Sequence, residues 1–190
     1  MPIKLYEEVY YIAHLKNLWS IAEHGILSKT VLNKKNIRPT DISDPDVQRW
    51  RDRKEPVHGC SIHDYVPLYF NPLNAMLYKR RNLRNALIIF TFQVRKLLHM
   101  KHLFTDGNAA SRDTKFSSEI ALVHTSDDIL RAMSWSELID GRRRRCAEML
   151  IHEQLPTQKI ENIFCYHQAI KDYAQTIIDC SVVVDQSMFY

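Results

Sequence analysis

Hydrophobic residues repeat along the chain with two periods, one typical of helices and one typical of strands. Leucine, tryptophan and alanine recur at helical spacing over residues 13–24, and Gly25 follows where a helix can end. Beyond Asn85 the run ALIIFTFQV, residues 86–94, is rich in β-branched and aromatic residues and predicts a strand. The same criteria predict further strands over 66–70, 143–151, 160–166 and 182–185, and further helices over 44–54, 72–82, 126–140 and 167–179.

Two long segments between these elements lack a clear period. Residues 26–43 are polar and predict a loop, and residues 102–118 are irregular around the turn sequence TDGN at 105–108. Helices and strands follow in a mixed order, and neither G-x-G-x-x-G nor G-x-x-x-x-G-K-[ST] occurs. The pattern therefore predicts an α+β fold with a mostly antiparallel sheet, and it does not support a Rossmann or P-loop nucleotide site.

Composition narrows the class of protein. The chain has 190 residues, 45% of them hydrophobic and 25% charged, with four glycines, which predicts one globular domain over residues 1–190. No apolar run reaches the ~18 residues that a membrane span needs, and the first residues carry no secretory cleavage pattern. The four cysteines lie far apart without a C-x-x-C pair, so we expect reduced thiols, a cytoplasmic location and no metal site.

Basic residues are clustered, although the net charge is only +4. A polyanionic partner, such as a nucleic acid or a phosphorylated cofactor, fits such clusters. A solvent-exposed face with scattered counter-charges fits them as well, so both interpretations stay open. The three clusters are Arg49, Arg51, Arg53 and Lys54; Lys79, Arg80, Arg81 and Arg84; and Arg142, Arg143, Arg144 and Arg145.

Glu148 is the first candidate for chemistry. It lies between Cys146 and Leu150 on one face of its predicted strand. A buried carboxylate without a partner is costly, so Glu148 is either a working acid or half of a salt bridge to a neighbouring arginine. His14 and the tyrosine-rich segment 64–78 are further candidates. Their alternative roles are structural, as a hydrogen-bonded histidine and as aromatic core.

The order of these features resembles the His–Tyr–Glu layout of poly-ADP-ribose-polymerase-like ADP-ribosyltransferases. The closer resemblance is to the DarT family of bacterial DNA ADP-ribosyltransferase toxins, and it extends over essentially the whole chain. The matching segments are 14–18 (HLKNL), 25–27 (GIL), 64–70 (DYVPLYF), 76–78 (MLY), 105–109 (TDGNA), 114–116 (TKF), 142–151 (RRRRCAEMLI) and 189–190 (FY). The resemblance implies an ADP-ribosyltransferase fold with a split, mostly antiparallel sheet and flanking helices.

This resemblance also implies an activity. The protein would transfer ADP-ribose from NAD+ to a base in single-stranded DNA, with thymidine as the expected base, and act as a toxin that blocks DNA replication. Glu148 would stabilise the positive charge that develops on the ribose. Arg51 would act on the base, with Arg49 and Arg53 as alternatives. Since arginine stays protonated in proteins, charge stabilisation suits this residue better than a role as a free base.

Binding residues and partners follow from the same resemblance. His14 would hold the adenosine-side ribose of NAD+, and Tyr78 would stack on its nicotinamide ring. Asn17 and Leu27 would add contacts, under a covering loop formed by residues 26–43. The residues expected to contact DNA are Asn108, Arg49, Arg53, Lys79 and Arg80. The implied partner is a macrodomain antitoxin similar to DarG, and the implied enzyme is a monomer that needs neither metal nor membrane.

Two other functions stay open on sequence alone. The same chemistry can serve guanosine in DNA, or an RNA or protein acceptor, because a fold does not determine its acceptor. The basic clusters also fit a nucleic-acid-binding module without catalysis. Such a module predicts binding that weakens steeply with salt and no product that depends on NAD+.

Overall fold

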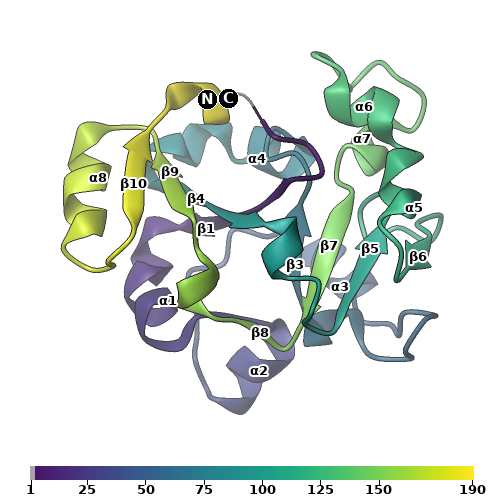
Figure 1. Ribbon diagram of the computed structural model, residues 1–190, viewed down its shortest axis with the longest axis horizontal. Coiled ribbons are helices and arrows are strands. Elements are labelled where there is room, and N and C mark those ends of the chain that lie inside the picture. The colour runs from purple at the N-terminus through teal and green to yellow at the C-terminus, as the bar shows by residue number, and fades with distance from the viewer. Residues whose placement is uncertain (1–2) are drawn as a thin grey trace.

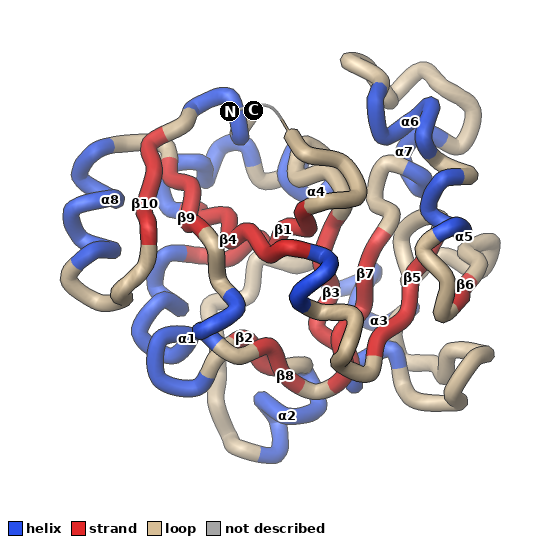
Figure 2. Tube along the Cα trace, in the orientation of Figure 1, coloured by secondary structure: helices blue, strands red, loops and turns tan. Residues whose placement is uncertain are grey.

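The computed structural model describes residues 3–190 as an α+β fold around a mostly antiparallel sheet (Figure 1). Eight strands form this sheet in the order β10-β9-β4-β1-β3-β7-β5-β6, in which only β9 and β10 run parallel to each other. A separate antiparallel pair is formed by β2 and β8 (Figure 2). This architecture confirms the predicted fold class.

The described strands and helices are mostly short. The strands are β1 (Glu8–His14), β2 (Ile26–Leu27), β3 (Tyr65–Tyr69), β4 (Leu87–Gln93), β5 (His102–Thr105), β6 (Phe116–Ser117), β7 (Glu148–His152), β8 (Gln154–Leu155), β9 (Asn162–Cys165) and β10 (Ser181–Val184). The helices are α1 (Leu18–His24), α2 (Lys29–Lys34), α3 (Pro45–Trp50), α4 (Ala75–Lys79), α5 (Ala121–His124), α6 (Asp127–Arg131), α7 (Gly141–Arg144) and α8 (Gln168–Gln175).

The central strand β4 is buried on both faces, which explains its nearly unbroken apolar sequence. Ile88 and Phe90 point into the main hydrophobic core. Leu87 and Ile89, on the other face, pack in a second core that includes Phe189 near the end of the chain. Helix α8 flanks the sheet beside β10, and α5, α6 and α7 lie at the opposite end beyond β7 and β5 (Figure 1).

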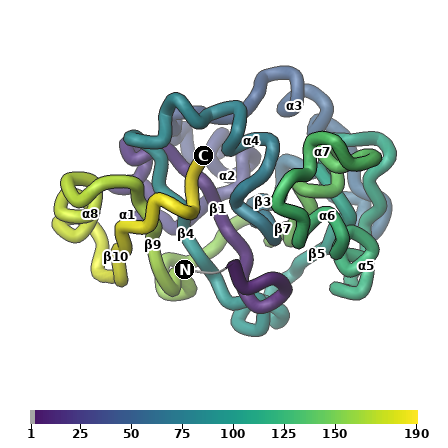
Figure 3. Tube along the Cα trace, turned by 90° about the horizontal axis from the view of Figure 1, so that it is seen from above, coloured from purple at the N-terminus to yellow at the C-terminus, as the bar shows by residue number. Residues whose placement is uncertain are grey.

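The sheet is divided between β1 and β3. Although β1 pairs with β4 over seven residues, it meets β3 at the single registered pair Tyr10–Tyr69. Strands β10, β9, β4 and β1 form one half, and β3, β7, β5 and β6 form the other (Figure 3). This division corresponds to the split sheet that the resemblance implies, and it leaves room for a cavity between the halves.

The first helix begins later than predicted, because residues 13–14 pair with β4 as the end of β1. A 3-10 turn over Leu15–Asn17 then precedes α1. Gly25 ends α1 as predicted. Its φ is 75°, and a Cβ at this position would lie 2.6 Å from the carbonyl oxygen of Leu155, so only glycine fits without strain.

Two segments predicted to be irregular contain regular elements. Within residues 26–43, β2 pairs with β8 and α2 follows it. The side chain of Ser28 caps α2 by accepting from the N–H of Val31. Within residues 102–118, β5 and β6 form an edge of the sheet. These two strands are short and hold too few apolar residues for a period to be recognised.

The strand predicted over residues 143–151 is wrong in its first part. Gly141–Arg144 forms α7, and β7 begins only at Glu148. Asp140, which precedes α7, has a φ of 55°. This left-handed backbone conformation interrupts any regular element directly before α7, and it cannot be recognised from the spacing of hydrophobic residues.

The helix predicted over residues 126–140 is also too long. It ends as α6, because Ala132 has an extended backbone. The guanidinium of Arg145 lies there and donates from Nη1 to the carbonyl oxygens of residues 129, 130 and 132 at 2.7, 3.0 and 2.9 Å. A distant arginine thus satisfies the carbonyl groups that a longer helix would have used.

Other helices are shorter than predicted as well. Helix α3 ends at Trp50 rather than near residue 54, and the helix predicted over 72–82 is divided into α4 and a 3-10 turn over Arg81–Ala86. The strands predicted over 66–70, 86–94, 160–166 and 182–185 and the helix over 167–179 are confirmed with shorter or shifted ends. No helix within residues 3–190 is long and apolar enough to cross a bilayer.

Candidate active site

A cavity of about 1260 Å³ opens at the division between β1 and β3. Small-molecule sites typically measure about 300–1,000 Å³, so this cavity has room for a dinucleotide and part of a second substrate. Its walls come from β1 and β3, from α2, α3 and the segment between them, from α4, and from residues 108–112. Segments far apart in the sequence therefore surround one space.

Arg51 lines this cavity and is paired with Glu148 behind it. Nη1 and Nη2 of Arg51 donate to Oε1 and Oε2 of Glu148 at 3.2 and 2.7 Å. The two side chains are 6% and 0% exposed. The salt bridge that the sequence offered as one interpretation of Glu148 exists, but its arginine lies 97 residues away and not in the adjacent arginine run.

The surrounding backbone holds the Glu148 carboxylate in place. Glu148 is the first residue of β7 and lies opposite Tyr69 of β3. Its N–H donates to Oγ1 of Thr105 at 3.0 Å, and the N–H of Ala109 donates to its Oε1 at 3.1 Å. Contacts from several segments therefore fix the carboxylate before any ligand arrives, as a group that stabilises developing charge requires.

The charges of this pair are linked. Burial alone would lower the pKa of Arg51, but the adjacent Glu148 carboxylate outweighs burial and holds that pKa above its ordinary value. Burial and the negative charge of Glu148 raise the pKa of the Tyr69 hydroxyl well above its usual range. Arg51 and Tyr69 are therefore both protonated at neutral pH. Among these three side chains, only the carboxylate can accept a proton.

Asn17 lies at the cavity, and it holds the segment between α2 and α3. Its Nδ2 donates to the carbonyl oxygen of Thr40 at 3.0 Å, and its Oδ1 accepts from the N–H of Thr40 at 2.8 Å. This reciprocal pair ties residues 36–44 to the start of α1. The segment therefore lies along the cavity wall, where a covering loop is expected.

Lys79 and Arg80 hold the same segment from α4. Arg80 donates from Nε and Nη2 to the carbonyl oxygens of residues 42 and 43 at 2.7 and 2.8 Å. Lys79 forms an ion pair with Asp44, and this pair lowers the pKa of the Asp44 carboxyl. Both basic side chains line the cavity, and both are bonded to other residues of the protein.

Arg53 supports the loop that carries Ala109. Its Nη2 donates to the carbonyl oxygens of Ala109 and Ser111 at 3.0 and 2.6 Å, and its guanidinium lies 5.9 Å from the ring centre of Phe116. Because Ala109 donates to Glu148, Arg53 acts on the carboxylate through one intervening residue. Of the three candidate arginines, only Arg51 contacts Glu148 itself.

The remaining predicted residues at the cavity are Arg49, Asn108 and Leu27. Arg49 is exposed and pairs with Asp46 on its own helix. Oδ1 of Asn108 accepts from the N–H of Ala110 at 2.9 Å, which shapes the loop to which Arg53 donates. Leu27 is buried and gives the wall an apolar patch.

Two predicted contact residues lie outside the cavity lining. The ring of Tyr78 packs edge-on against Tyr190 and Trp135, with centroid distances of 5.2 and 6.4 Å, and Arg81 lies over it. His14 accepts from the N–H of Lys16 through Nδ1 at 3.1 Å and begins the turn before α1.

The tyrosines that do line the cavity are Tyr11, Tyr65 and Tyr69. Tyr69 belongs to the segment DYVPLYF, which was a candidate from the sequence. The alternation of residues along a strand does not tell which of its tyrosines faces a cavity.

Most arginines of the basic clusters contact other residues of the protein and do not simply extend into solvent. Arg143 binds Asp106 and Asp140, Arg144 binds Asp128, and Arg145 binds backbone carbonyls. Arg81 and Arg84 lie over tyrosine rings at 4.3 and 4.8 Å. In the fourfold arginine run, Arg142 is exposed and lines the cavity.

The split sheet, with a buried glutamate at the head of a late strand beside a large cavity, defines the class of ADP-ribosyltransferases. Solved structures of similar fold agree with this class. The structure aligns with Thermosipho africanus DarTG in complex with ADP-ribose at a TM-score of 0.87 and 26% identity, over 97% of this chain and 51% of that one. It aligns with Thermus sp. 2.9 DarT in complex with ADP-ribosylated ssDNA at 0.83 and 21%, over 97% and 96% of the two chains.

This chain belongs to the DarT family, because the family model described as ssDNA thymidine ADP-ribosyltransferase, DarT, matches residues 10–190. It is 27% identical to a DNA ADP-ribosyl transferase–DNA ADP-ribosyl glycohydrolase fusion protein of Thermosipho africanus, over 97% of this chain and 50% of that protein. It is 24% identical to a DNA ADP-ribosyl transferase of Thermus sp., over 90% and 86%. The chain thus spans half of the fusion protein. The predicted family and fold are confirmed.

Proposed function

We propose that this protein transfers ADP-ribose from NAD+ to thymidine in single-stranded DNA. The observation that carries the proposal is the buried pair of Arg51 and Glu148 at a cavity of dinucleotide size. Membership of the DarT family, described by its model as ssDNA thymidine ADP-ribosyltransferase, supports the acceptor. Solved DarT complexes with NAD+ and with ADP-ribosylated ssDNA support the co-substrate and the product.

The first step breaks the bond between nicotinamide and the ribose C1′. Positive charge develops on the ribose, and nicotinamide leaves with the bonding electrons. A carboxylate that is already in place stabilises this charge without reorganisation. Because Arg51 covers Glu148, its guanidinium gives up at least one of its two hydrogen bonds when the ribose hydroxyls reach the carboxylate. The ion pair therefore keeps Glu148 oriented until substrate replaces part of it.

The second step forms the bond between the thymine N3 and C1′. N3 carries a proton that must leave as the bond forms. Arg51 stays protonated, as its raised pKa shows, so it stabilises negative charge on the base and does not remove the proton. The carboxylate of Glu148 accepts the proton in this scheme, directly or through a water molecule.

The roles of the binding residues follow from their contacts. In this proposal Tyr69, not Tyr78, stacks beside the nicotinamide, since Tyr69 lines the cavity next to Arg51. Asn17 and Arg80 position the 36–44 segment over NAD+. Arg49 and Arg142 are exposed at the cavity and meet the DNA phosphates.

Several wider features belong to the same proposal. The protein acts in the cytoplasm as a toxin that blocks DNA replication. A macrodomain antitoxin similar to DarG counteracts it by removing the ADP-ribose. The fusion of a DNA ADP-ribosyl transferase with a DNA ADP-ribosyl glycohydrolase in Thermosipho africanus supports this pairing of activities.

The acceptor is tested with single-stranded oligonucleotides that each lack one base. Each strand is incubated with the protein and NAD+, and its intact mass is measured. We expect a gain of one ADP-ribose unit on every strand that contains thymidine and on none that lacks it. The same sequences as duplexes are the control for single-strand dependence.

Two outcomes would contradict the proposal in different ways. Modification of the strand that lacks thymidine, or consumption of NAD+ without a change in DNA mass, would move the activity to another acceptor. No mass change and no loss of NAD+ would instead favour binding without catalysis.

A further inference from the structure

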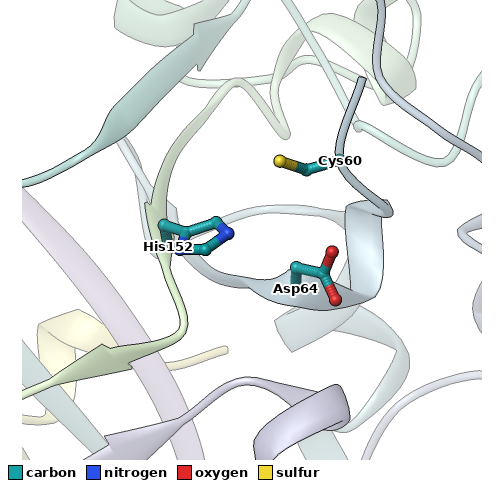
Figure 4. A group of neighbouring side chains, drawn as sticks. All are labelled: Cys60, Asp64 and His152. Atoms are coloured by element: carbon teal, nitrogen blue, oxygen red, sulfur yellow. The ribbon is translucent and has the colours of Figure 1, made fainter. Parts of the chain in front are cut away.

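Cys60, Asp64 and His152 form a cluster outside the lining of the main cavity (Figure 4). The thiol, one carboxylate oxygen and one ring nitrogen all lie within 4.8 Å of one another. Figure 4 shows the three side chains around a common space, with Cys60 and Asp64 from one segment and His152 from β7. Nothing in the reaction proposed above uses these groups, although each is a ligand type for a transition metal.

The fold holds the backbone of this cluster firmly. Tyr65 of β3 pairs with His152 of β7, so two neighbouring strands fix the histidine beside Asp64. Asp64 belongs to a capping box in which its Oδ2 accepts from the N–H of Ser61 at 3.0 Å. Cys60 is held by Glu55, whose carboxylate accepts its N–H at 2.9 Å.

We propose that Cys60, Asp64 and His152 bind one Zn²⁺ ion, with a fourth position left to solvent. A thiolate, an imidazole and a carboxylate in one tetrahedral set favour Zn²⁺ over Mg²⁺ or Ca²⁺, which prefer all-oxygen sites. Ligands at about 2.0–2.3 Å from a tetrahedral ion lie roughly 3.3–3.8 Å apart. The three side chains thus close by about 1 Å through rotation of their torsions, and the Cys60 thiol releases its proton to solvent.

Existing contacts are compatible with this ion. Nζ of Lys101 lies 3.1 Å from the Cys60 sulfur, and Lys101 is exposed, so its ammonium group can move into solvent as the ion enters. Oδ1 of Asp64 accepts from Oγ1 of Thr30 at 2.7 Å. Each carboxylate oxygen has two lone pairs, so one remains for the metal. The contact with Thr30 then orients the carboxylate as an outer-shell partner does.

This site was not predictable from the sequence, because its residues do not form a C-x-x-C or similar pair. Cys60 and Asp64 are near in sequence, whereas His152 comes from β7, whose first residue is Glu148. The ion would join the segment that follows Arg51 to this strand. Zn²⁺ therefore stabilises the framework on which the ion pair of the active site is built.

The test is titration of the reduced, chelator-treated protein with Co²⁺ and Zn²⁺. Co²⁺ bound to a thiolate gives a charge-transfer absorption in the near ultraviolet, and we expect one equivalent to produce it and Zn²⁺ to displace it. We also expect Zn²⁺ to raise the melting temperature. Absence of the thiolate band in the wild-type protein overturns the proposal, whatever the variants do.

Variants assign the ligands. Cys60→Ser is expected to abolish the band, and His152→Gln to weaken binding at least as strongly as loss of an outer-shell partner, about 10- to 100-fold. Cys180→Ser, at another half-buried cysteine, is the matched control and leaves the titration unchanged. Lys101→Gln removes the competing charge and strengthens binding. An unchanged band in Cys60→Ser, or a lost band in Cys180→Ser, contradicts the assignment.

Discussion

Replacing Glu148 with glutamine is expected to slow ADP-ribose transfer by about 100- to 1,000-fold, the usual cost of losing one preorganised charge-stabilising group. Glutamine keeps the shape of the side chain, and its amide oxygen can still accept from Nη1 of Arg51 and from the N–H of Ala109. The bond from Nη2 of Arg51 is lost, because the amide nitrogen is a donor. The substitution removes the negative charge that faces the ribose. The measurement is the single-turnover rate of oligonucleotide modification, followed by intact mass.

The control for this prediction is another buried carboxylate. Glu55 is 1% exposed and accepts from three backbone N–H groups and the Tyr65 hydroxyl, contacts that lower its pKa despite burial. We expect Glu55→Gln to reduce stability while the transfer rate stays within severalfold. A folded Glu148→Gln variant with the wild-type rate would remove Glu148 from the chemistry.

Removing Arg51 alone is expected to destabilise the fold by about 3–5 kcal/mol, because it leaves the Glu148 carboxylate buried without its partner. Arg51→Met tests this expectation, since methionine fills a similar volume without charge. The double variant Arg51→Met/Glu148→Leu removes both charges and should recover most of the lost stability, while transfer stays abolished. Urea unfolding of wild type, both single variants and the double variant gives the coupling between the two sites.

This cycle separates two explanations of the pair. If Arg51 and Glu148 form one buried unit, the losses in the single variants do not add up in the double variant. If the two losses are simply additive, the pair contributes no coupling and the account of the ion pair is wrong. Restored stability without activity would show that the charges are kept for chemistry and not for the fold.

The candidate site was predictable where a local rule applies. A carboxylate among apolar residues on a strand is costly, and this alone singled out Glu148. Its partner was not predictable in the same way. The local pattern offered the adjacent arginine run, but those arginines bind acidic residues and helix-end carbonyls beside α6. Arg51 could be named only through resemblance to the DarT family, because its contact spans 97 residues.

The fold shows the same limit. Strand β4 was recognised because burial on both faces leaves an apolar run. The end of α6 and the start of α7 were missed, because Arg145 and the left-handed Asp140 determine them through tertiary contacts and a single backbone angle. That Tyr69 lines the cavity was not predictable for a similar reason, because it depends on how β3 meets β1.

The most direct test of the account is a crystal structure of this protein with the unreactive analogue carba-NAD+. We predict that the analogue lies in the cavity between β1 and β3, with a hydroxyl of its nicotinamide-side ring about 2.6–3.2 Å from the Glu148 carboxylate. Arg51 should then have released at least one of its two hydrogen bonds to Glu148. An analogue bound elsewhere, or bound with that pair intact and the ring hydroxyls away from Glu148, would contradict the proposed role of this site.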